Sequence, residues 1–389
     1  MLGALAGGAR VHNLSDCDDT RAMSLAMTQR PALCDIGAAG TAMRFSTAFF
    51  AVTPGRRRLT GSARMLERPV RPLVDALRRL GADIAYAGRE GFPPLDISGR
   101  RLSGGEVEVP ADISSQYISA LLMIGPMLAH GLRLRLRGEV ASRPYIEMTL
   151  ALMQHFGAET RWEDDVIVVM PKAYDPTAEY RVEADWSAAS YWYEIVALAP
   201  DEDAEVLLEG LSAHSLQGDA RVCDFFETLG VETTFTPEGA RLRKRPTQHN
   251  ALRTADGAEI FETDLSQQPD LAQTLVATCA AMGRNFRISG LHSLRIKETD
   301  RIAALRAELA KTGCIVTEPE EGTLAGHFAP TQALVAPEAG IDTYDDHRMA
   351  MAFAPLALRC GPLRINRPEV VTKSYLGFWN DLEKLGASR

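Results

Sequence analysis

The chain has 389 residues, of which 46% are hydrophobic and 24% are charged, which is enough for two or three domains with cores of their own. Its formal net charge of −9 argues against a dedicated nucleic-acid-binding protein, although a small anionic substrate needs only a local basic patch. The longest apolar run, at 118–129, contains Gly125 and Pro126 and is too short to cross a membrane.

Cysteine and histidine spacing favours neither disulfides nor a metal site. The six cysteines form no Cys-x-x-Cys pair, and the eight histidines form no HExxH motif. We therefore expect reduced thiols in a cytoplasmic protein without a metal. The apolar residues 1–8 lack a basic leader, so they are not typical of a signal peptide. They instead predict the end of a helix closed by Gly7 and Gly8.

Taken in order, the chain next predicts a helix beginning at the acidic pair Asp18 and Asp19, followed by a short segment at 24–35. From there, a helical stretch followed by glycine and a strand-like run recurs. The glycines stand at positions 81, 157, 230, 313 and 386, in steps of 76, 73, 83 and 73 residues. A glycine directly after a helix supplies the left-handed cap that ends it.

A second kind of helix, rich in small residues, recurs with nearly the same period. Its examples begin at Gly40, Ser115, Ser187, Asp270 and His347, in steps of 75, 72, 83 and 77 residues. The two matching series indicate a duplicated unit of two helices and several strands, repeated about five or six times. Strand-like runs between the helices are found at 133–136, 166–170, 205–208, 286–288 and 363–365.

Alternating helices and strands predict an α/β (α+β) fold. The segment 175–185 contains Pro176 and several charges and falls midway through the series. We expect two domains, 1–181 and 182–389, with about three units each and a shortened first unit.

Charged and hydroxyl side chains gather where the helices begin. The densest group is RIKETDR at 295–301, before a helix expected at 302–311. Helix N-termini attract anions, and hydroxyls, lysines and arginines recognise phosphate and carboxylate groups. Each group also has a plainer interpretation. Ser114 and Ser115 suit a helix cap, as does Asp270 after Pro269. Arg64 can pair with Glu67, and residues 346–348 can form a surface turn.

Six runs resemble one family, the 3-phosphoshikimate 1-carboxyvinyltransferases or EPSP synthases. They are GAAGTAMR (37–44), LTGSARMLERP (59–69), SSQYISALLM (114–123), SRPYIEMTL (142–150), RIKETDRI (295–302) and DDHRMAMAF (345–353). The resemblance implies two domains, each with three βαβαββ units, helices inside and sheets outside, and an active site in the cleft between them. It also implies that no metal or cofactor is used.

The implied reaction joins two small-molecule substrates. The 5-hydroxyl of shikimate 3-phosphate attacks C2 of phosphoenolpyruvate, the methylene carbon is protonated, and phosphate leaves. This step of the shikimate pathway leads to chorismate and the aromatic amino acids. We expect a cytoplasmic monomer that binds neither nucleic acid nor membrane.

The resemblance also implies roles for individual residues. Asp270 would be the base and Glu298 the proton donor, with Lys373 as a third catalytic group. Shikimate 3-phosphate would be held by Ser114, Ser115, Gln116, Ser142, Tyr145, Asp270, Ser293 and Lys297. Phosphoenolpyruvate would be held by Gly40, Thr41, Arg64, Gln116, Arg301, Arg348 and Lys373. Arg295 and Asp300 are expected only to pair with each other or flank the site.

Three departures from the family pattern keep other interpretations open. Ala38 and Ser293 stand where the family has asparagine, and its N-terminal Lys-Ser-x-x-x-Arg motif is absent. The main alternative is therefore a truncated member that binds shikimate 3-phosphate or phosphate with little or no turnover. A UDP-N-acetylglucosamine carboxyvinyltransferase is less favoured because no cysteine lies near 64–71. An RNA 3′-phosphate cyclase is disfavoured by the acidic charge and by the KETDR and SSQ runs.

Overall fold

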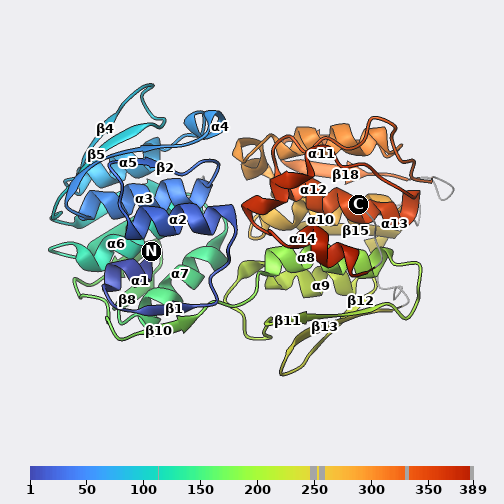
Figure 1. The fold of residues 1–389 in the computed structure, drawn as a ribbon, viewed down its shortest axis with the longest axis horizontal. Coiled ribbons are helices and arrows are strands. Elements are labelled where there is room, and N and C mark those ends of the chain that lie inside the picture. Colours follow the sequence, from blue (N-terminus) through green and yellow to red (C-terminus); the bar gives the residue numbers. More distant parts are fainter. Residues whose placement is uncertain (113, 246–251, 254–258, 329–332, 386–389) are drawn as a thin grey trace. The chain divides into compact units, whose positions relative to one another are not determined.

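The computed structural model describes residues 1–112, 114–245, 252–253, 259–328 and 333–385. The chain divides into two units, Met1–Val182 and Glu183–Arg389, each of which is described by itself (Figure 1). Within the described part, no helix has the length and apolar character needed to cross a bilayer.

The first unit alternates helices and short strands from its beginning. Its elements are α1 (Leu2–Ala6), β1 (Arg10–His12), α2 (Asp18–Thr28), β2 (Leu33–Asp35), α3 (Gly40–Val52), β3 (Gly55–Thr60), α4 (Ala63–Leu66), α5 (Arg71–Arg79), β4 (Asp83–Tyr86), β5 (Leu95–Gly99), β6 (Gly105–Pro110), α6 (Ser115–Ile124), the 3-10 turn η1 (Gly125–Met127), β7 (Leu132–Arg137), α7 (Arg143–His155), β8 (Thr160–Glu163), β9 (Val166–Val169) and β10 (Glu179–Arg181).

The second unit continues the alternation. Its elements are α8 (Trp186–Leu198), β11 (Glu205–Glu209), η2 (Gly218–Arg221), α9 (Val222–Glu227), β12 (Val231–Phe235), β13 (Gly239–Lys244), β14 (Leu252–Arg253), β15 (Glu259–Asp264), η3 (Pro269–Leu271), α10 (Ala272–Ala281), β16 (Asn285–Ser289), η4 (His292–Ile296), α11 (Arg301–Lys311), β17 (Val316–Glu320), β18 (Thr323–Gly326), α12 (His347–Phe353), η5 (Ala354–Leu356), α13 (Ala357–Cys360), η6 (Pro368–Lys373) and α14 (Phe378–Glu383).

One pattern of strand pairing recurs in both units. In the sheet β2-β3-β5-β4, the first pair is parallel and the other two are antiparallel. The sheet β6-β7-β9-β8 repeats these directions, and so do β15, β16, β18 and β17. Each copy is a βαβαββ unit, since a helix connects the parallel strands and a second helix follows. The sheet β11-β13-β12 and the parallel pair β1-β10 are partial versions.

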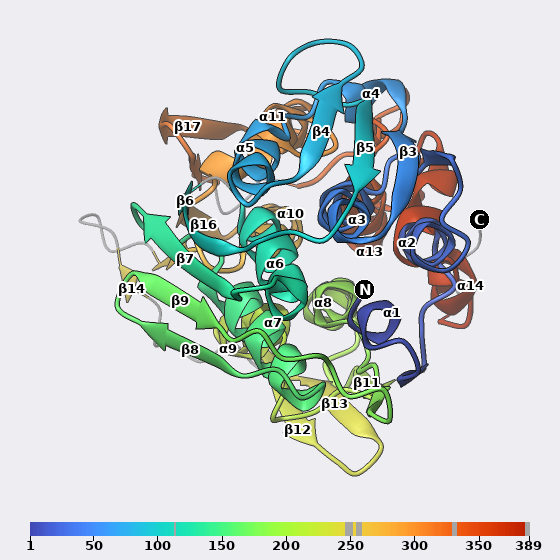
Figure 2. The same cartoon turned by 90° about the vertical axis from the view of Figure 1, so that its left-hand side faces the viewer.

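Helices fill the interior of each unit. Helix α3 is buried over nearly its whole length, from Gly40 to Ala51, and α6 is buried from Tyr117 to Ile124. Figure 2 shows α3 nearly end-on and α6 obliquely, with the strands of the first unit outside them. Helices α8, α10 and α12 are buried in the same way in the second unit. Because these helices are apolar or small on all sides, they can only be stable inside a core.

The sheets present their polar face outward. In β7, Leu132, Leu134 and Leu136 are buried, and the arginines between them are more exposed. Arg135 forms ion pairs with Glu106 on β6 and with Asp165. Alternation with a period of two residues places one set of side chains on the core and the other in water.

Most predicted elements are found in the structure. Gly81, Gly157, Gly230 and Gly313 each follow a helix with φ between 86° and 101°, and Gly7 ends α1 with φ 77°. The fifth predicted cap, Gly386, lies outside the described residues. The strands predicted at 133–136, 166–170, 205–208 and 286–288 correspond to β7, β9, β11 and β16.

The strand predicted at 363–365 is wrong. Only an isolated parallel bridge joins Ile341 to Ile365. Pro362 and Pro368 flank this short run and cannot donate backbone hydrogen bonds, and Arg367 adopts a left-handed conformation with φ 57°. The segment therefore has too little regular backbone to extend the pairing.

Candidate active site

A cluster of charged side chains in the second unit surrounds the start of α11. Asp300 caps this helix by accepting a hydrogen bond from the Ala303 amide at 3.0 Å. Lys297 and Glu298 lie in the short connection from η4, and Arg301 is the first helical residue. The expectation that Arg295 and Asp300 pair with each other is confirmed by a contact of 3.1 Å.

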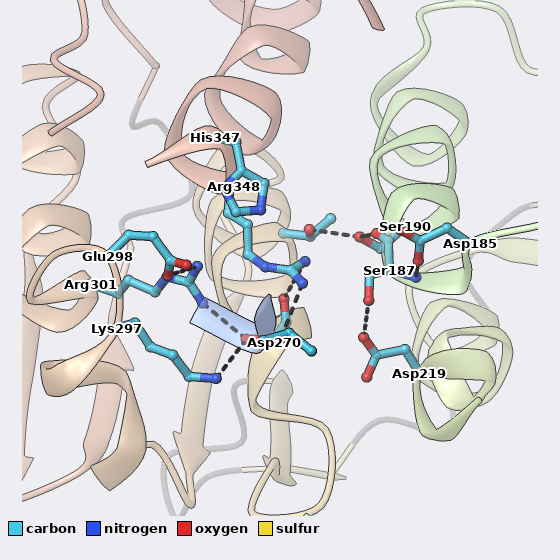
Figure 3. Close-up of polar contacts among 12 residues, drawn as sticks. Asp185, Ser187, Ser190, Asp219, Asp270, Lys297, Glu298, Arg301, His347 and Arg348 are labelled. Atoms are coloured by element: carbon cyan, nitrogen blue, oxygen red, sulfur yellow. Dashed lines mark hydrogen bonds and ion pairs between the residues drawn. The ribbon is translucent and has the colours of Figure 1, made fainter. Parts of the chain in front are cut away.

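The Asp270 carboxylate contacts three positively charged side chains. Asp270 lies in η3, the turn that leads into α10, rather than capping that helix. Its carboxylate contacts Arg301 Nη1 at 2.9 Å, Arg348 Nη2 at 3.1 Å and Lys297 Nζ at 3.3 Å. Figure 3 shows these side chains converging on Asp270.

Arg301 connects the same cluster to two further carboxylates. It is only 2% exposed. Its Nε and Nη2 atoms donate to Asp346 at 2.7 and 3.3 Å, and Nη2 also donates to Glu298 at 3.0 Å. Glu298 in turn lies 3.4 Å from the Lys373 ammonium. An arginine with its guanidinium shared among carboxylates is held in one orientation.

The electrostatic balance of the cluster keeps its main groups ionised. Burial alone would raise the pKa of Asp270, but Arg348, Lys297 and Arg301 outweigh burial and hold that pKa below its ordinary value. Burial alone would lower the pKa of Arg301, whereas Asp346, Glu298 and Asp270 raise it overall. By residue type, the cluster holds four basic side chains (Lys297, Arg301, Arg348 and Lys373) and three carboxyl groups (Asp270, Glu298 and Asp346), which suits an anionic ligand.

The start of α12 supplies the last part of the cluster. Asp346 caps this helix by accepting a hydrogen bond from the Arg348 amide at 2.9 Å. The Arg348 guanidinium also lies 3.4 Å from the hydroxyl of the buried Tyr191 on α8. His347 is buried, and burial followed by the charges of Lys373 and Arg348 lowers its pKa well below the ordinary value. We therefore expect a neutral imidazole at this position.

A second polar group lies on α8, beside the cluster (Figure 3). Asp185 caps α8 by accepting a hydrogen bond from the Ser187 amide at 2.8 Å. The Ser187 hydroxyl donates to Asp219, and Ser190 hydrogen-bonds Thr274 at 2.9 Å. Burial alone would lower the pKa of Arg348, but Asp270 and Tyr191, followed by Asp219 and Asp185, raise it well above the ordinary value.

In the first unit, predicted residues meet at the starts of α3 and α6. Gln116 Nε2 donates to the Thr41 hydroxyl at 2.9 Å. The plainer interpretation of Ser114 also holds, because its hydroxyl caps α6 and accepts from the Gln116 amide at 3.3 Å. Gly40 lies against two arginines: a Cβ added there would be 2.7 Å from Arg68 Nη1 and 3.2 Å from Arg44 Nη1.

The remaining predicted residues lie at neighbouring helix starts. Ser115 is the first residue of α6, while Ser142, with φ 54°, immediately precedes α7. A hydrogen bond of 2.7 Å between Ser119 and Thr149 joins these two helices one turn further on. Tyr145 lies in the first turn of α7, and Ser293 lies in η4. Arg64 is part of an exposed pair with Glu67 at 3.2 Å.

The sequence analysis assigned no site role to several residues that the structure places in these groups. They are Arg44, Arg68, Asp185, Tyr191, Asp219 and Asp346. A signal existed for Asp346 and Asp185, since aspartate before a helix is a usual cap. The remaining residues, Arg44, Arg68, Tyr191 and Asp219, are identified by their burial and their polar contacts, which the local sequence does not reveal. Among the described residues, no group of His, Cys, Asp and Glu has the arrangement needed to hold a metal ion.

Comparisons with known proteins agree over nearly the whole chain. Residues 1–382 match the family model described as EPSP synthase (3-phosphoshikimate 1-carboxyvinyltransferase). A 3-phosphoshikimate 1-carboxyvinyltransferase of Bacteroides fragilis is 50% identical over 388 residues, covering 99% of this chain and 91% of the relative. One of Shewanella halifaxensis is 34% identical over 414 residues, covering 99% and 93%.

Solved structures show the same fold. An EPSP synthase from Acinetobacter baumannii has a TM-score of 0.73 at 20% identity, covering 98% of this chain and 93% of that one. The enolpyruvyl transferase NikO from Streptomyces tendae has a TM-score of 0.67 at 16% identity, covering 100% and 92%. Both similarities extend over the full length of the chain rather than over one unit.

Proposed function

Because the chain belongs to the EPSP synthase family, we infer that it transfers the carboxyvinyl group of phosphoenolpyruvate to the 5-hydroxyl of shikimate 3-phosphate and releases phosphate. It is therefore a transferase of the shikimate pathway. The identity of 50% across 99% of the chain carries this conclusion. The same similarity disfavours the alternative of a truncated, weakly active or inactive member that only binds its ligands.

The charged cluster of the second unit supports the acid–base steps. We assign Asp270 as the base that takes the proton of the attacking 5-hydroxyl. The oxygen of that hydroxyl bonds to C2 of phosphoenolpyruvate. Glu298, which carries a proton when both substrates are bound, delivers it to the methylene carbon, and Lys373, at 3.4 Å from Glu298, stabilises the carboxylate that this transfer leaves behind. The Glu298 carboxylate then takes a proton back from the resulting methyl group while phosphate leaves with the proton held by Asp270, which restores the double bond in the product.

The state of Asp270 bears directly on this role. Its lowered pKa keeps it ionised at neutral pH, as a base must be, but also makes it a weak proton acceptor. Arg348 and Lys297 contact its carboxylate at 3.1 and 3.3 Å. Anionic substrates are expected to take over these cations, and loss of the two contacts raises the proton affinity of Asp270. The base is then strongest when both substrates are bound.

Substrate contacts divide by chemistry. We propose that the hydroxyl-bearing helix starts of the 1–181 domain hold shikimate 3-phosphate together with Ser293 and Lys297. The hydroxyl and amide groups concerned are Ser114, Ser115, Gln116, Ser142 and Tyr145. Phosphoenolpyruvate is assigned to Gly40, Thr41, Arg64 and Gln116 and to Arg301, Arg348 and Lys373. Fixed cations favour a reaction in which negative phosphate leaves.

The setting of the enzyme is also a proposal. We propose a cytoplasmic monomer that binds neither nucleic acid nor membrane. The six cysteines, all within the described residues, are present as thiols, and burial raises the pKa of Cys34 to about 11 and of Cys279 to about 12. Such thiols are inert in a reducing compartment. Light scattering during gel filtration measures the mass directly, and a dimer mass would contradict the proposal.

The test is a phosphate-release assay with both substrates. We expect release that requires shikimate 3-phosphate and phosphoenolpyruvate together. Asp270→Asn and Glu298→Gln should each lower kcat by about 10²- to 10⁴-fold, the usual contribution of a general acid or base. Arg295→Gln, which changes a neighbouring charge outside the assigned site, serves as the matched control. Ligand binding without phosphate release by the wild-type chain would instead support the binding-only alternative.

A further inference from the structure

The turn that leads into α12 has an unusual backbone. Tyr344 and Asp345 are consecutive residues with φ of 54° and 57°. Neither is glycine, and a tyrosine in the left-handed region persists only where its surroundings hold it. The turn 343–346 ends on Asp346, whose amide donates to the Thr343 carbonyl at 2.8 Å. The conformation of this turn therefore decides where α12 begins.

Glu308 on α11 contacts this turn from inside the unit. Its side chain is fully buried. One carboxylate oxygen accepts the Tyr344 hydroxyl at 2.6 Å, and the other accepts the Asp342 amide at 2.9 Å. Lys311, one turn further along α11, lies 2.7 Å from Glu308 and 2.8 Å from Asp342. A buried carboxylate with a cation and two donors is costly to disturb, so it forms a firm anchor.

Helix α11 also contacts the last residue of the turn 343–346. Arg301 donates to Asp346 at 2.7 Å. Arg301 and Glu308 are seven residues apart on α11, so they lie on one face of the helix, separated by about 10 Å along its axis. Helix α11 therefore contacts this segment at two places. Glu308 hydrogen-bonds Asp342 and Tyr344 at the beginning of the turn, and Arg301 hydrogen-bonds Asp346 where α12 starts.

The position of Arg348 depends on these contacts between α11 and the turn. Arg348 is the second residue of α12, and Asp346 caps its amide at 2.9 Å. Its guanidinium reaches both the carboxylate and the backbone carbonyl of Asp270, at 3.1 and 3.3 Å. A relaxed turn would shift the beginning of α12 and displace the Arg348 guanidinium from the place where an anionic substrate is expected to meet it.

We propose that Glu308 is a positioning residue for the reaction: with Tyr344 it holds the turn 343–346 in the conformation that orients Asp346 and Arg348. Glu308 touches neither substrate in this assignment and acts only through the turn. The inference rests on the proposed function, because Arg348 is assigned to phosphoenolpyruvate.

The test compares Glu308→Gln and Tyr344→Phe with the wild type. Tyr344→Phe removes only the hydroxyl and is the milder change, so it keeps the test informative if Glu308→Gln folds poorly. At a temperature where circular dichroism shows each variant fully folded, we expect kcat/KM for phosphoenolpyruvate to fall by between about tenfold and about a hundredfold. The KM for shikimate 3-phosphate should change less than threefold. The double variant should lose no more than the worse single variant, since both break one connection.

Arg367→Gln is the matched control, because Arg367 pairs with Asp345 on the exposed side of the same turn. It should keep wild-type kinetics. The proposal is overturned if both variants melt at lower temperature but keep wild-type kcat/KM when folded. It is equally overturned if the KM values of both substrates rise together, or if the control loses as much as Tyr344→Phe. A wild-type chain without phosphate release would count against the proposed function instead.

Discussion

At the scale of single residues, Arg301 is the side chain on which the charged cluster depends. It is 2% exposed, and Asp346 beside it is fully buried. Buried ions are stable only when they are paired, so the arginine and its carboxylates require one another. The same ion pairs therefore set both the folding stability of the second unit and the geometry of its candidate site.

Replacing Arg301 by glutamine should destabilise the second unit by about 3–5 kcal/mol, because it leaves the Asp346 carboxylate buried without its cation. Urea unfolding measures the loss. Arg221→Gln removes an arginine from an exposed pair with Asp224 and should cost less than about 1 kcal/mol. Equal losses in the two variants would contradict a special role for the buried pair.

Because of Glu194, we expect the free energy of unfolding to fall as the pH rises. Glu194 is fully buried on α8, and burial raises its pKa well above the ordinary value, offset in part by the Thr278 hydroxyl. A raised folded pKa contributes stability that is complete below the unfolded pKa of about 4.3 and is lost as the pH rises toward the folded pKa. The wild type should therefore lose up to about 1.4 kcal/mol per pH unit from this group over that window.

Glu194→Gln should remove this dependence, because the amide is neutral at every pH and close to the protonated carboxyl in shape. Urea unfolding between pH 5 and about pH 9 compares the slopes. The exposed Glu227→Gln on α9 provides the control and should keep the wild-type slope. Parallel curves for wild type and Glu194→Gln would show that Glu194 does not carry the effect.

At the scale of elements, helix starts rather than helix faces carry the chemistry. Helix α11 begins with Arg301, and α12 begins at the Asp346 cap. Helix α3 begins at Gly40 and α6 at the Ser114 cap. Free backbone amides and the positive end of the helix dipole favour anions at these places. The repeated βαβαββ unit produces such starts regularly, since each of its buried helices follows a strand.

Gly40→Ala tests how closely the start of α3 is packed. The new Cβ would lie 2.7 Å from Arg68 Nη1, so the guanidinium must move. We expect the KM for phosphoenolpyruvate to rise by roughly tenfold, equivalent to about 1.4 kcal/mol of binding. Steady-state kinetics with each substrate varied in turn gives the result.

Gly88→Ala is the matched control, because its Cβ would have no heavy atom nearer than 3.7 Å. It should leave both KM values unchanged. A Gly40→Ala variant with a wild-type KM for phosphoenolpyruvate would remove Gly40 from the assigned binding residues.

At the scale of the whole molecule, each unit has its own hydrophobic core. One core runs from Leu2 to Tyr174, and the other runs from Trp186 to Phe378. The division of the chain falls between Val182 and Glu183. Among the described residues, the buried residues of each core all come from a single unit, so we expect each unit to be able to lose its core packing separately.

Leu121→Ala should therefore destabilise only the first unit. Leu121 is fully buried on α6, and truncation of such a residue costs about 2–5 kcal/mol. Three of the four tryptophans, at 186, 192 and 379, belong to the second unit. During urea unfolding of Leu121→Ala, circular dichroism should show that the first unit unfolds at a lower urea concentration than in the wild type. The main transition in tryptophan fluorescence, which reports on the second unit, should keep the wild-type midpoint.

Leu14→Ala, at a residue that is 57% exposed, is the control and should change neither signal. A shift of both signals by the same amount in Leu121→Ala would mean that the two units unfold as one.

Several features could be predicted from the sequence because they depend on local chemistry. Glycine caps such as Gly81 and Gly313 end helices wherever they occur, since they adopt φ values that other residues avoid. The spacing of the two kinds of helix predicted the repeat, and the alternation of helices and strands predicted the α/β class. The short run at 363–365 failed because its two flanking prolines leave it little capacity for pairing.

The sequence by itself determined the family, the repeated unit and the acidic and basic residues of the helix starts, since these follow from residue type and spacing. Only the tertiary structure decided which of these charges share a hydrogen bond. Asp346 and Glu308 are separated by 38 residues (346 − 308), yet both act on the segment that carries Arg348. Such partners are chosen by burial, because a buried charge must find a partner wherever the fold places one.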